Sequence, residues 1–130
     1  MVWVNQGMNG VKTRIEFMDN TDKITCYDFF VVTSVEGLPS GERLFLEIGD
    51  LPIVIFNVDG NLSAIGDICT HDNGPLGDGE LENHFVTCPR HGARFDICSG
   101  AALTLPATMA TPSYPVRIIN GFIEIGIPGE

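Results

Sequence analysis

The chain has 130 residues, 44% of them hydrophobic, which suits a single globular domain and excludes a disordered chain. Its 17 acidic residues outnumber its 7 Lys and Arg residues, and the net charge of −10 makes nucleic acid and anionic membranes poor partners. No run approaches the roughly 18 apolar residues that a membrane helix needs. We therefore predict a soluble, cytoplasmic protein that binds neither nucleic acid nor membranes.

The first 25 residues are expected to form an N-terminal extension, with one candidate strand at residues 11–17. Residues 1–10 have neither the basic and apolar regions of a signal peptide nor a regular pattern, and we expect them to be poorly ordered. The folded domain is predicted to span residues 26–130.

This domain is dense in short β-branched runs separated by Gly, Pro, Asp and Asn. Strands are predicted at residues 28–35, 42–48, 52–58, 62–65, 85–87, 93–97, 116–119 and 122–127. The pairs Asp59-Gly60 and Asn120-Gly121 predict tight hairpin turns. No stretch of a dozen residues has a helical period, so the pattern indicates an all-β antiparallel sandwich or barrel.

Two short loops contain an unusual share of the metal-binding residue types. The first has Cys69-x-His71 and the second, after sixteen residues, has Cys88-x-x-His91, in a chain with only four Cys and three His. Each pair follows a predicted strand and is surrounded by turn residues. Thiolate and imidazole ligands together select zinc, copper or iron–sulfur centres. The two loops are therefore predicted to face each other and to hold one metal centre.

The arrangement of the two pairs favours iron over zinc without excluding a structural zinc site. Zinc fingers usually place both Cys in one half of the motif and both His in the other. Here each half contributes one of each, which suits a binuclear cluster with a Cys pair on one iron and a His pair on the other.

The paired motif, with CPRHGARFD around its second half, resembles that of Rieske 2Fe-2S proteins, over about residues 28–127. The resemblance implies an antiparallel β-sandwich with a small inserted cluster-binding subdomain, whose loops lie at about residues 66–108. It implies one 2Fe-2S cluster, with Cys69 and Cys88 on the inner iron and His71 and His91 on the outer iron. It also implies a proline-containing loop over the cluster, for which Leu105-Pro106-Ala107 is the candidate.

The resemblance is not to the Rieske subunits of cytochrome bc-type complexes. Those proteins have a second Cys in each cluster loop, and the two form a disulfide, whereas this chain has Gly74 and Arg90 there. They also have Ser and Tyr hydroxyls that donate to cluster sulfurs, where this chain has Ala93 and Phe95. Because these donors are missing, we expect a potential at the low end of the Rieske range, roughly −150 mV.

Large subunits of ring-hydroxylating oxygenases have a Rieske domain as well, followed by a catalytic iron site of two His and a carboxylate. Only His84 remains here outside the motif, so that site cannot be built. The resemblance thus implies a ferredoxin that is not catalytic alone and that carries single electrons from a flavin-dependent ferredoxin reductase to a terminal non-haem iron oxygenase. The alternative is a Rieske-like small subunit or accessory of another reductase or of an iron–sulfur assembly system.

Four residues around the motif complete the predictions. His84 is expected to be a structural or surface residue, and Cys26 and Cys98 small apolar side chains. Arg90 is expected to project outward on a docking face formed by residues 70–79 and 89–93.

Overall fold

A computed structural model describes residues 2–4, 13–18 and 24–129, with side chains from Tyr27 to Gly129. The described residues form strands and one short 3-10 helix, η1 (Val35–Gly37). The strands are β1 (Val2–Val4), β2 (Thr13–Met18), β3 (Ile24–Ser34), β4 (Arg43–Ile48), β5 (Leu51–Val58), β6 (Asn61–Gly66), β7 (Glu80–Glu82), β8 (Phe85–Thr87), β9 (Arg94–Asp96), β10 (Ser113–Tyr114), β11 (Val116–Ile119) and β12 (Phe122–Pro128).

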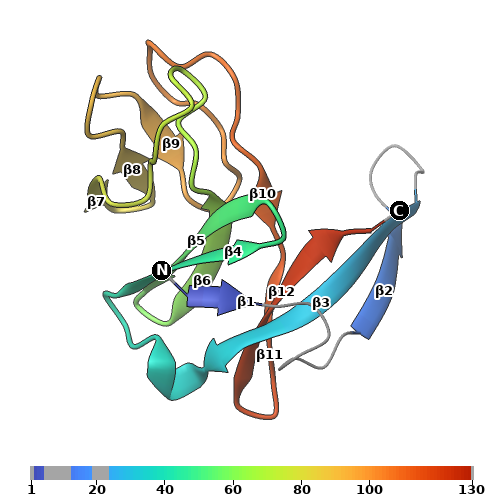
Figure 1. The fold of residues 1–130 in the computed structure, drawn as a ribbon. Helices are drawn as coiled ribbons and strands as arrows, with labels where there is room; N and C mark the ends of the chain where they lie inside the picture. Colours follow the sequence, from blue (N-terminus) through green and yellow to red (C-terminus); the bar gives the residue numbers. More distant parts are fainter. Residues whose placement is uncertain (1, 5–12, 19–23, 130) are drawn as a thin grey trace.

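The strands form three sheets, with orders β1-β4-β5-β6-β10, β11-β12-β3-β2 and β7-β8-β9. The pairings described are antiparallel, except that β1 runs parallel to β4. Figure 1 shows the small third sheet at one end of the molecule and the β11–β12 hairpin at the other. The predicted all-β sandwich with a small inserted subdomain is confirmed.

The two predicted hairpin turns form as expected. Asp59 and Gly60 have φ angles of 53° and 87°, and Asn120 and Gly121 have φ angles of 51° and 80°. Two successive left-handed residues are the geometry of a tight turn that matches the twist of the flanking strands. They join β5 to β6 and β11 to β12, which pair residue by residue.

Strand β5 is buried on both faces and takes part in two hydrophobic cores. Its side chains alternate, with Ile53 and Ile55 in the first core and Val54 and Phe56 in the second, all 0% exposed. The first core fills the space between the two large sheets and includes Phe30, Leu38, Leu46, Ile48, Ala64, Tyr114, Ile123, Ile125 and Ile127.

The second core lies on the opposite face of β5 and joins the large sheet to the small third sheet. It contains Ile65, Leu76, Val86, Ala93, Phe95, Ile97 and Ala107, together with the thiols of Cys69 and Cys88. The inserted subdomain therefore has a core that is continuous with the main sheet.

The N-terminal residues contribute more strands than the sequence predicts. The strand expected at residues 11–17 is found as β2, while residues 11 and 12 lie outside the described residues. Within residues 1–10, which were expected to be poorly ordered, β1 pairs with β4. The division into an extension of residues 1–25 and a domain of residues 26–130 stays a prediction. Among the described helical segments, none has the length and apolar character to cross a membrane.

The two ends of the long loop between β9 and β10 lie next to each other. The Thr111 amide donates to the Gly100 carbonyl at 2.9 Å, and the Thr111 hydroxyl donates to the Gly66 carbonyl at 3.2 Å. Gly100 has φ +78°, and a Cβ built on it would lie 2.0 Å from the Thr111 carbonyl oxygen. The base of this loop therefore leaves no room for a side chain at Gly100.

We predict that Gly100→Ala destabilises the protein more than Gly41→Ala. Both glycines are left-handed, but a Cβ on Gly41 (φ +87°) would meet nothing within 4 Å. Each substitution is expected to lower the free energy of unfolding by about 1 kcal/mol, because alanine disfavours a left-handed backbone. Gly100→Ala is expected to lower it by about 2 kcal/mol more, because the Thr111 backbone must move. Denaturant unfolding of both variants measures this difference. Equal losses of unfolding free energy in the two variants would mean that the Thr111 backbone moves without cost.

Candidate metal centre

Each Cys-His loop is closed by backbone hydrogen bonds around its cysteine. In the first loop, the Cys69 amide donates to the Gly74 carbonyl at 2.8 Å, and the Asn73 amide donates to the Cys69 carbonyl at 2.7 Å. In the second loop, the Cys88 amide donates to the Ala93 carbonyl at 2.7 Å. Each loop thus curls tightly after a strand, which leaves its cysteine at the base and its histidine near the tip.

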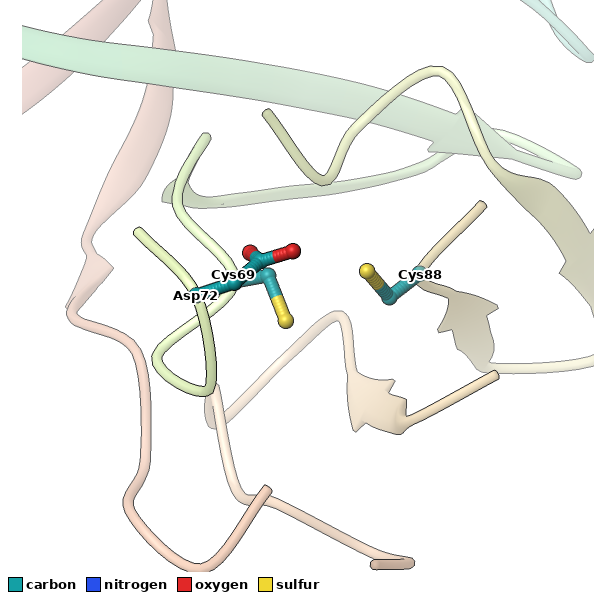
Figure 2. Close-up of side chains that lie close together, drawn as sticks. All are labelled: Cys69, Asp72 and Cys88. Carbon is teal, nitrogen blue, oxygen red and sulfur yellow. The ribbon is translucent and has the colours of Figure 1, made fainter. Parts of the chain in front are cut away.

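The two thiols lie in the second core and point toward each other (Figure 2). Cys69 is 0% and Cys88 1% exposed, and neither forms a disulfide. Burial raises the pKa of the Cys69 thiol above its usual value, and the neighbouring Cys88 raises it further. A cation between the two sulfurs would reverse this effect, because metal binding deprotonates thiols.

The two imidazoles lie side by side on the outer side of the loops. The rings of His71 and His91 have centroids 4.8 Å apart and an interplanar angle of 86°, and both residues are exposed. The structure therefore brings the four predicted residues together, as one buried thiol pair and one exposed imidazole pair. This donor set fits a binuclear cluster, since each pair can serve one iron.

Asp72, which the sequence places only within the expected docking face of residues 70–79, adds a carboxylate to this arrangement. One of its oxygens lies within 4.8 Å of ligand atoms from both cysteines, and the same holds for both histidines. Its side chain is 21% exposed and pairs with Arg90, which holds the pKa of Asp72 far below its usual value. The position of Asp72 directly after His71 was the available clue, but its Arg90 partner comes from the other loop.

Arg90 is exposed, as predicted, but its guanidinium is held by partners on both loops. Its guanidinium donates to both carboxylate oxygens of Asp72, at 2.6 Å and 2.9 Å, and to the Cys88 sulfur at 3.4 Å. The ion pair raises the pKa of Arg90 above its usual value. A disulfide between the two loops would need cysteines at positions 74 and 90. This chain has Gly74 and Arg90 there, and the Arg90 side chain lies in close contact with Gly74.

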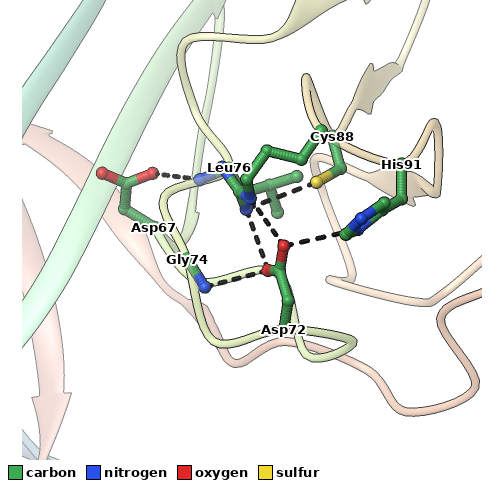
Figure 3. A network of polar contacts seen from close by, with 7 residues as sticks. Asp67, Asp72, Gly74, Leu76, Cys88 and His91 are labelled. Atoms are coloured by element: carbon green, nitrogen blue, oxygen red, sulfur yellow. Dashed lines mark hydrogen bonds and ion pairs between the residues drawn. The ribbon is translucent and has the colours of Figure 1, made fainter.

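Asp67 fixes the far end of the first loop. This residue is 8% exposed, and its Oδ1 atom accepts a hydrogen bond from the Leu76 amide at 2.9 Å (Figure 3). The same oxygen accepts one from the Gly77 amide at 2.6 Å. Its own amide donates to the Pro52 carbonyl on β5 at 3.0 Å. The first loop is thus tied at both ends to the sheet that supports the second core.

The loop around Pro106 packs against the first Cys-His loop, and its place over the cluster stays a prediction. Ala107 is buried in the second core, and the Thr70 hydroxyl donates to the Met109 carbonyl at 2.5 Å. Leu105 and Met109 remain 77% and 69% exposed. The rim of the site therefore presents apolar side chains to solvent.

His84 lies apart from the other two histidines, with its side chain 66% exposed and its Nε2 atom 3.7 Å from Asp96. It is a surface residue, as expected. Cys98 is also exposed and free, while the side chain of Cys26 lies outside the described part, so a role as small apolar side chains stays a prediction. His84 and Cys98 both line a pocket of about 220 Å³, together with residues of the β5–β6 hairpin.

Burial acts to raise the pKa of Asp96, but hydrogen bonds from the amides of Ser99 and Cys98 hold it below its usual value. This carboxylate therefore caps the turn after β9 and fixes the chain where it leaves the second loop.

Comparison with known proteins agrees with this geometry. A family model described as the Rieske 2Fe-2S domain matches residues 28–115. The ferredoxin component of the naphthalene 1,2-dioxygenase/salicylate 5-hydroxylase systems of Ralstonia sp. is 35% identical over 86 residues, which cover 66% of this chain and 83% of that protein. The 3-phenylpropionate/cinnamic acid dioxygenase ferredoxin subunit of Escherichia coli (strain K12) is 41% identical over 95 residues, covering 72% and 89%.

Among solved structures, the ferredoxin of Sphingomonas yanoikuyae B1 is 32% identical and superposes with a TM-score of 0.69, covering 75% of this chain and 97% of that one. Sequence, fold and the facing pairs of thiols and imidazoles lead to one conclusion: the chain belongs to the Rieske 2Fe-2S family, with one Rieske-type cluster as its cofactor.

Proposed function

We propose that this protein is a one-electron carrier, the ferredoxin component that supplies a terminal oxygenase. The observation that carries the proposal is the separation of the donor set into a buried thiol pair and an exposed imidazole pair on two facing loops. Relatives that match most of their own length are ferredoxin components of dioxygenase systems, which supports an oxygenase as the partner. A flavin-dependent ferredoxin reductase is the proposed electron donor, and we retain the cytoplasmic location expected from the sequence.

Four residues are proposed as the ligands, Cys69 and Cys88 on the inner iron and His71 and His91 on the outer iron. A bound Rieske cluster supplies one-electron oxidation and reduction. The second core excludes water from the two cysteines, which are at most 1% exposed. The exposed imidazoles bring the redox centre close to the surface, so a partner that covers them comes within a short distance of it.

The remaining residues favour a carrier over an enzyme. Outside the metal centre, the described part places His84 next to the carboxylate of Asp96. One histidine and one carboxylate cannot form a site of two His and a carboxylate. The proposed partner therefore provides the oxygen chemistry, and this chain provides electrons.

We predict that the purified protein contains about two irons and two labile sulfides per chain. Cys69→Ser and Cys88→Ser are expected to abolish the visible absorption, because each removes a thiolate from the inner iron. Cys98→Ser should retain it, since Cys98 is exposed and outside the second core. Metal analysis and visible spectra test this directly. A colourless protein with one zinc per chain would contradict the proposal.

The potential is proposed to lie at the low end of the Rieske range, roughly −150 mV. Ala93 and Phe95 are fully buried in the core that holds both thiols, and neither side chain has a hydroxyl to donate. Hydrogen bonds to the sulfurs favour the more negative reduced state, so their absence lowers the potential.

We expect Ala93→Ser and Phe95→Tyr each to raise the midpoint potential. One added hydrogen bond of about 1 kcal/mol corresponds to about 40 mV for a one-electron couple. Ala64→Ser is the matched control, because Ala64 is equally buried but belongs to the first core. Spectroelectrochemical titration gives the three values. Potentials that rise no further than that of the control would show that hydroxyls at these positions do not govern the potential.

The docking face is proposed to comprise the two histidines and the apolar rim of Leu105 and Met109. Small, transient contacts are typical of electron-transfer partners. Arg90 is already paired with Asp72, so it is not the residue to test. Exposed Leu105 and Met109 lie on a loop hydrogen-bonded to the first Cys-His loop, which makes them the better choice.

Replacing Leu105 and Met109 together by Ser is expected to lower the second-order rate of electron transfer to the cognate oxygenase several-fold. The apolar contact would be lost while the spectrum and potential stay unchanged. Ile118→Ser with Phe122→Ser is the control, because these side chains are 52% and 48% exposed on the hairpin at the opposite end (Figure 1). Stopped-flow rates decide. Slower electron transfer by the protein with Ile118→Ser and Phe122→Ser, or an unchanged rate for the protein with Leu105→Ser and Met109→Ser, would place the docking face elsewhere.

A further inference from the structure

Asp72 and Arg90 connect the two Cys-His loops through a two-point ion pair. The Arg90 Nε atom donates to Asp72 Oδ2 at 2.6 Å, and Nη2 donates to Oδ1 at 2.9 Å. Planar, two-point pairs of this kind fix both partners in orientation as well as in distance. The pair crosses from the loop that contains Cys69 to the loop that contains Cys88.

The carboxylate of Asp72 is itself held in place. Its Oδ1 atom accepts a hydrogen bond from the Gly74 amide at 2.9 Å, and its Oδ2 atom lies 3.5 Å from His91 Nδ1 (Figure 3). The side chains of Asp72 and Arg90 are only 21% and 33% exposed, so solvent screens the pair incompletely. The position of the guanidinium is therefore set by the first loop, although Arg90 belongs to the second.

The same guanidinium contacts a thiol of the metal centre. Nη2, which donates to Asp72, also lies 3.4 Å from the Cys88 sulfur within hydrogen-bonding geometry. A Cβ built on Gly74 would lie 2.7 Å from the guanidinium Cζ and Nη2 atoms. A side chain at that position would displace the guanidinium from the sulfur.

We propose that Asp72 and Arg90 are positioning residues that hold the two cluster loops together and keep a cationic N–H donor on the Cys88 sulfur, which raises the potential of the bound cluster. This inference rests on the proposed function, since it takes Cys88 as a ligand. Reduction adds one negative charge to the centre, and a cationic donor on a ligand sulfur stabilises that more negative state. The carboxylate cannot donate to the sulfur, so its part is to orient Arg90.

Midpoint potentials of the cluster-containing parent and three variants test the inference. Arg90→Gln removes the cation and the contact, and the equilibrium constant for reduction is expected to fall about tenfold, which is about 59 mV for one electron. Gly74→Ala keeps both charges but displaces the guanidinium, so its potential should fall as well. Arg94→Gln makes the same change in net charge, yet within the described structure Arg94 lies over the Phe85 ring, 4.9 Å away, with no hydrogen bond to either cysteine, and its potential should change least.

Two further measurements separate positioning from charge. In an Asp72→Asn background, Arg90→Gln is expected to shift the potential less, because the guanidinium is no longer oriented on the sulfur. Iron loss to a chelator is expected to be several-fold faster in Arg90→Gln and Gly74→Ala than in the parent or in Arg94→Gln, because the loops are no longer tied.

The outcomes are distinct from those of the proposed function. A parent without the cluster spectrum, or one that passes no electrons to the oxygenase, refutes the proposed function. A parent that does both, with unchanged potentials in Arg90→Gln and Gly74→Ala, overturns this inference alone. An equal fall in Arg94→Gln would likewise overturn it, since net charge would suffice. If Arg90→Gln cannot hold a cluster, Gly74→Ala decides by its potential and its rate of iron loss.

Discussion

The burial of β5 on both faces is the constraint on which the rest of this structure depends. Ile53 and Ile55 close the core of the sandwich, and Val54 and Phe56 form the floor beneath the metal centre. A strand that is apolar on both sides needs cover on both sides. The sandwich alone covers one face, and the inserted subdomain with its two loops covers the other. The metal centre is thus built on a surface that would otherwise expose large hydrophobic side chains to water.

This shared strand also explains the polarity of the site. The cysteines are at the base of their loops and are buried in the second core, whereas the histidines follow them by two and three residues and are exposed. Local backbone hydrogen bonds around each cysteine set this order without any help from the partner loop. What the partner loop adds is the ion pair of Asp72 and Arg90, which joins two segments that also meet through the second core and the two imidazoles.

Patterns that are local in sequence were predictable, and contacts between distant residues were not. The turn pairs Asp59-Gly60 and Asn120-Gly121 located two hairpins, because left-handed residues in sequence determine the turn directly. The Cys-His spacing identified the family for the same reason. In contrast, the burial of Glu124 on β12 could not be predicted, because this carboxylate is only 4% exposed and pairs with Arg117 on the neighbouring strand β11. The Asp72–Arg90 pair was missed likewise, since eighteen residues separate its members.

The loop from Gly100 to Thr111 is closed at its base, and this has an evolutionary consequence. A segment whose two ends meet can change in length and side chains without shifting the register of any strand, and the entropic cost of extra length grows slowly. Leu105 and Met109 belong to this segment, whereas the thiols belong to the core beneath it. Mutation can therefore redesign the proposed docking face while the redox centre is inherited intact, so that one electron-carrier scaffold can be adapted to different oxygenases.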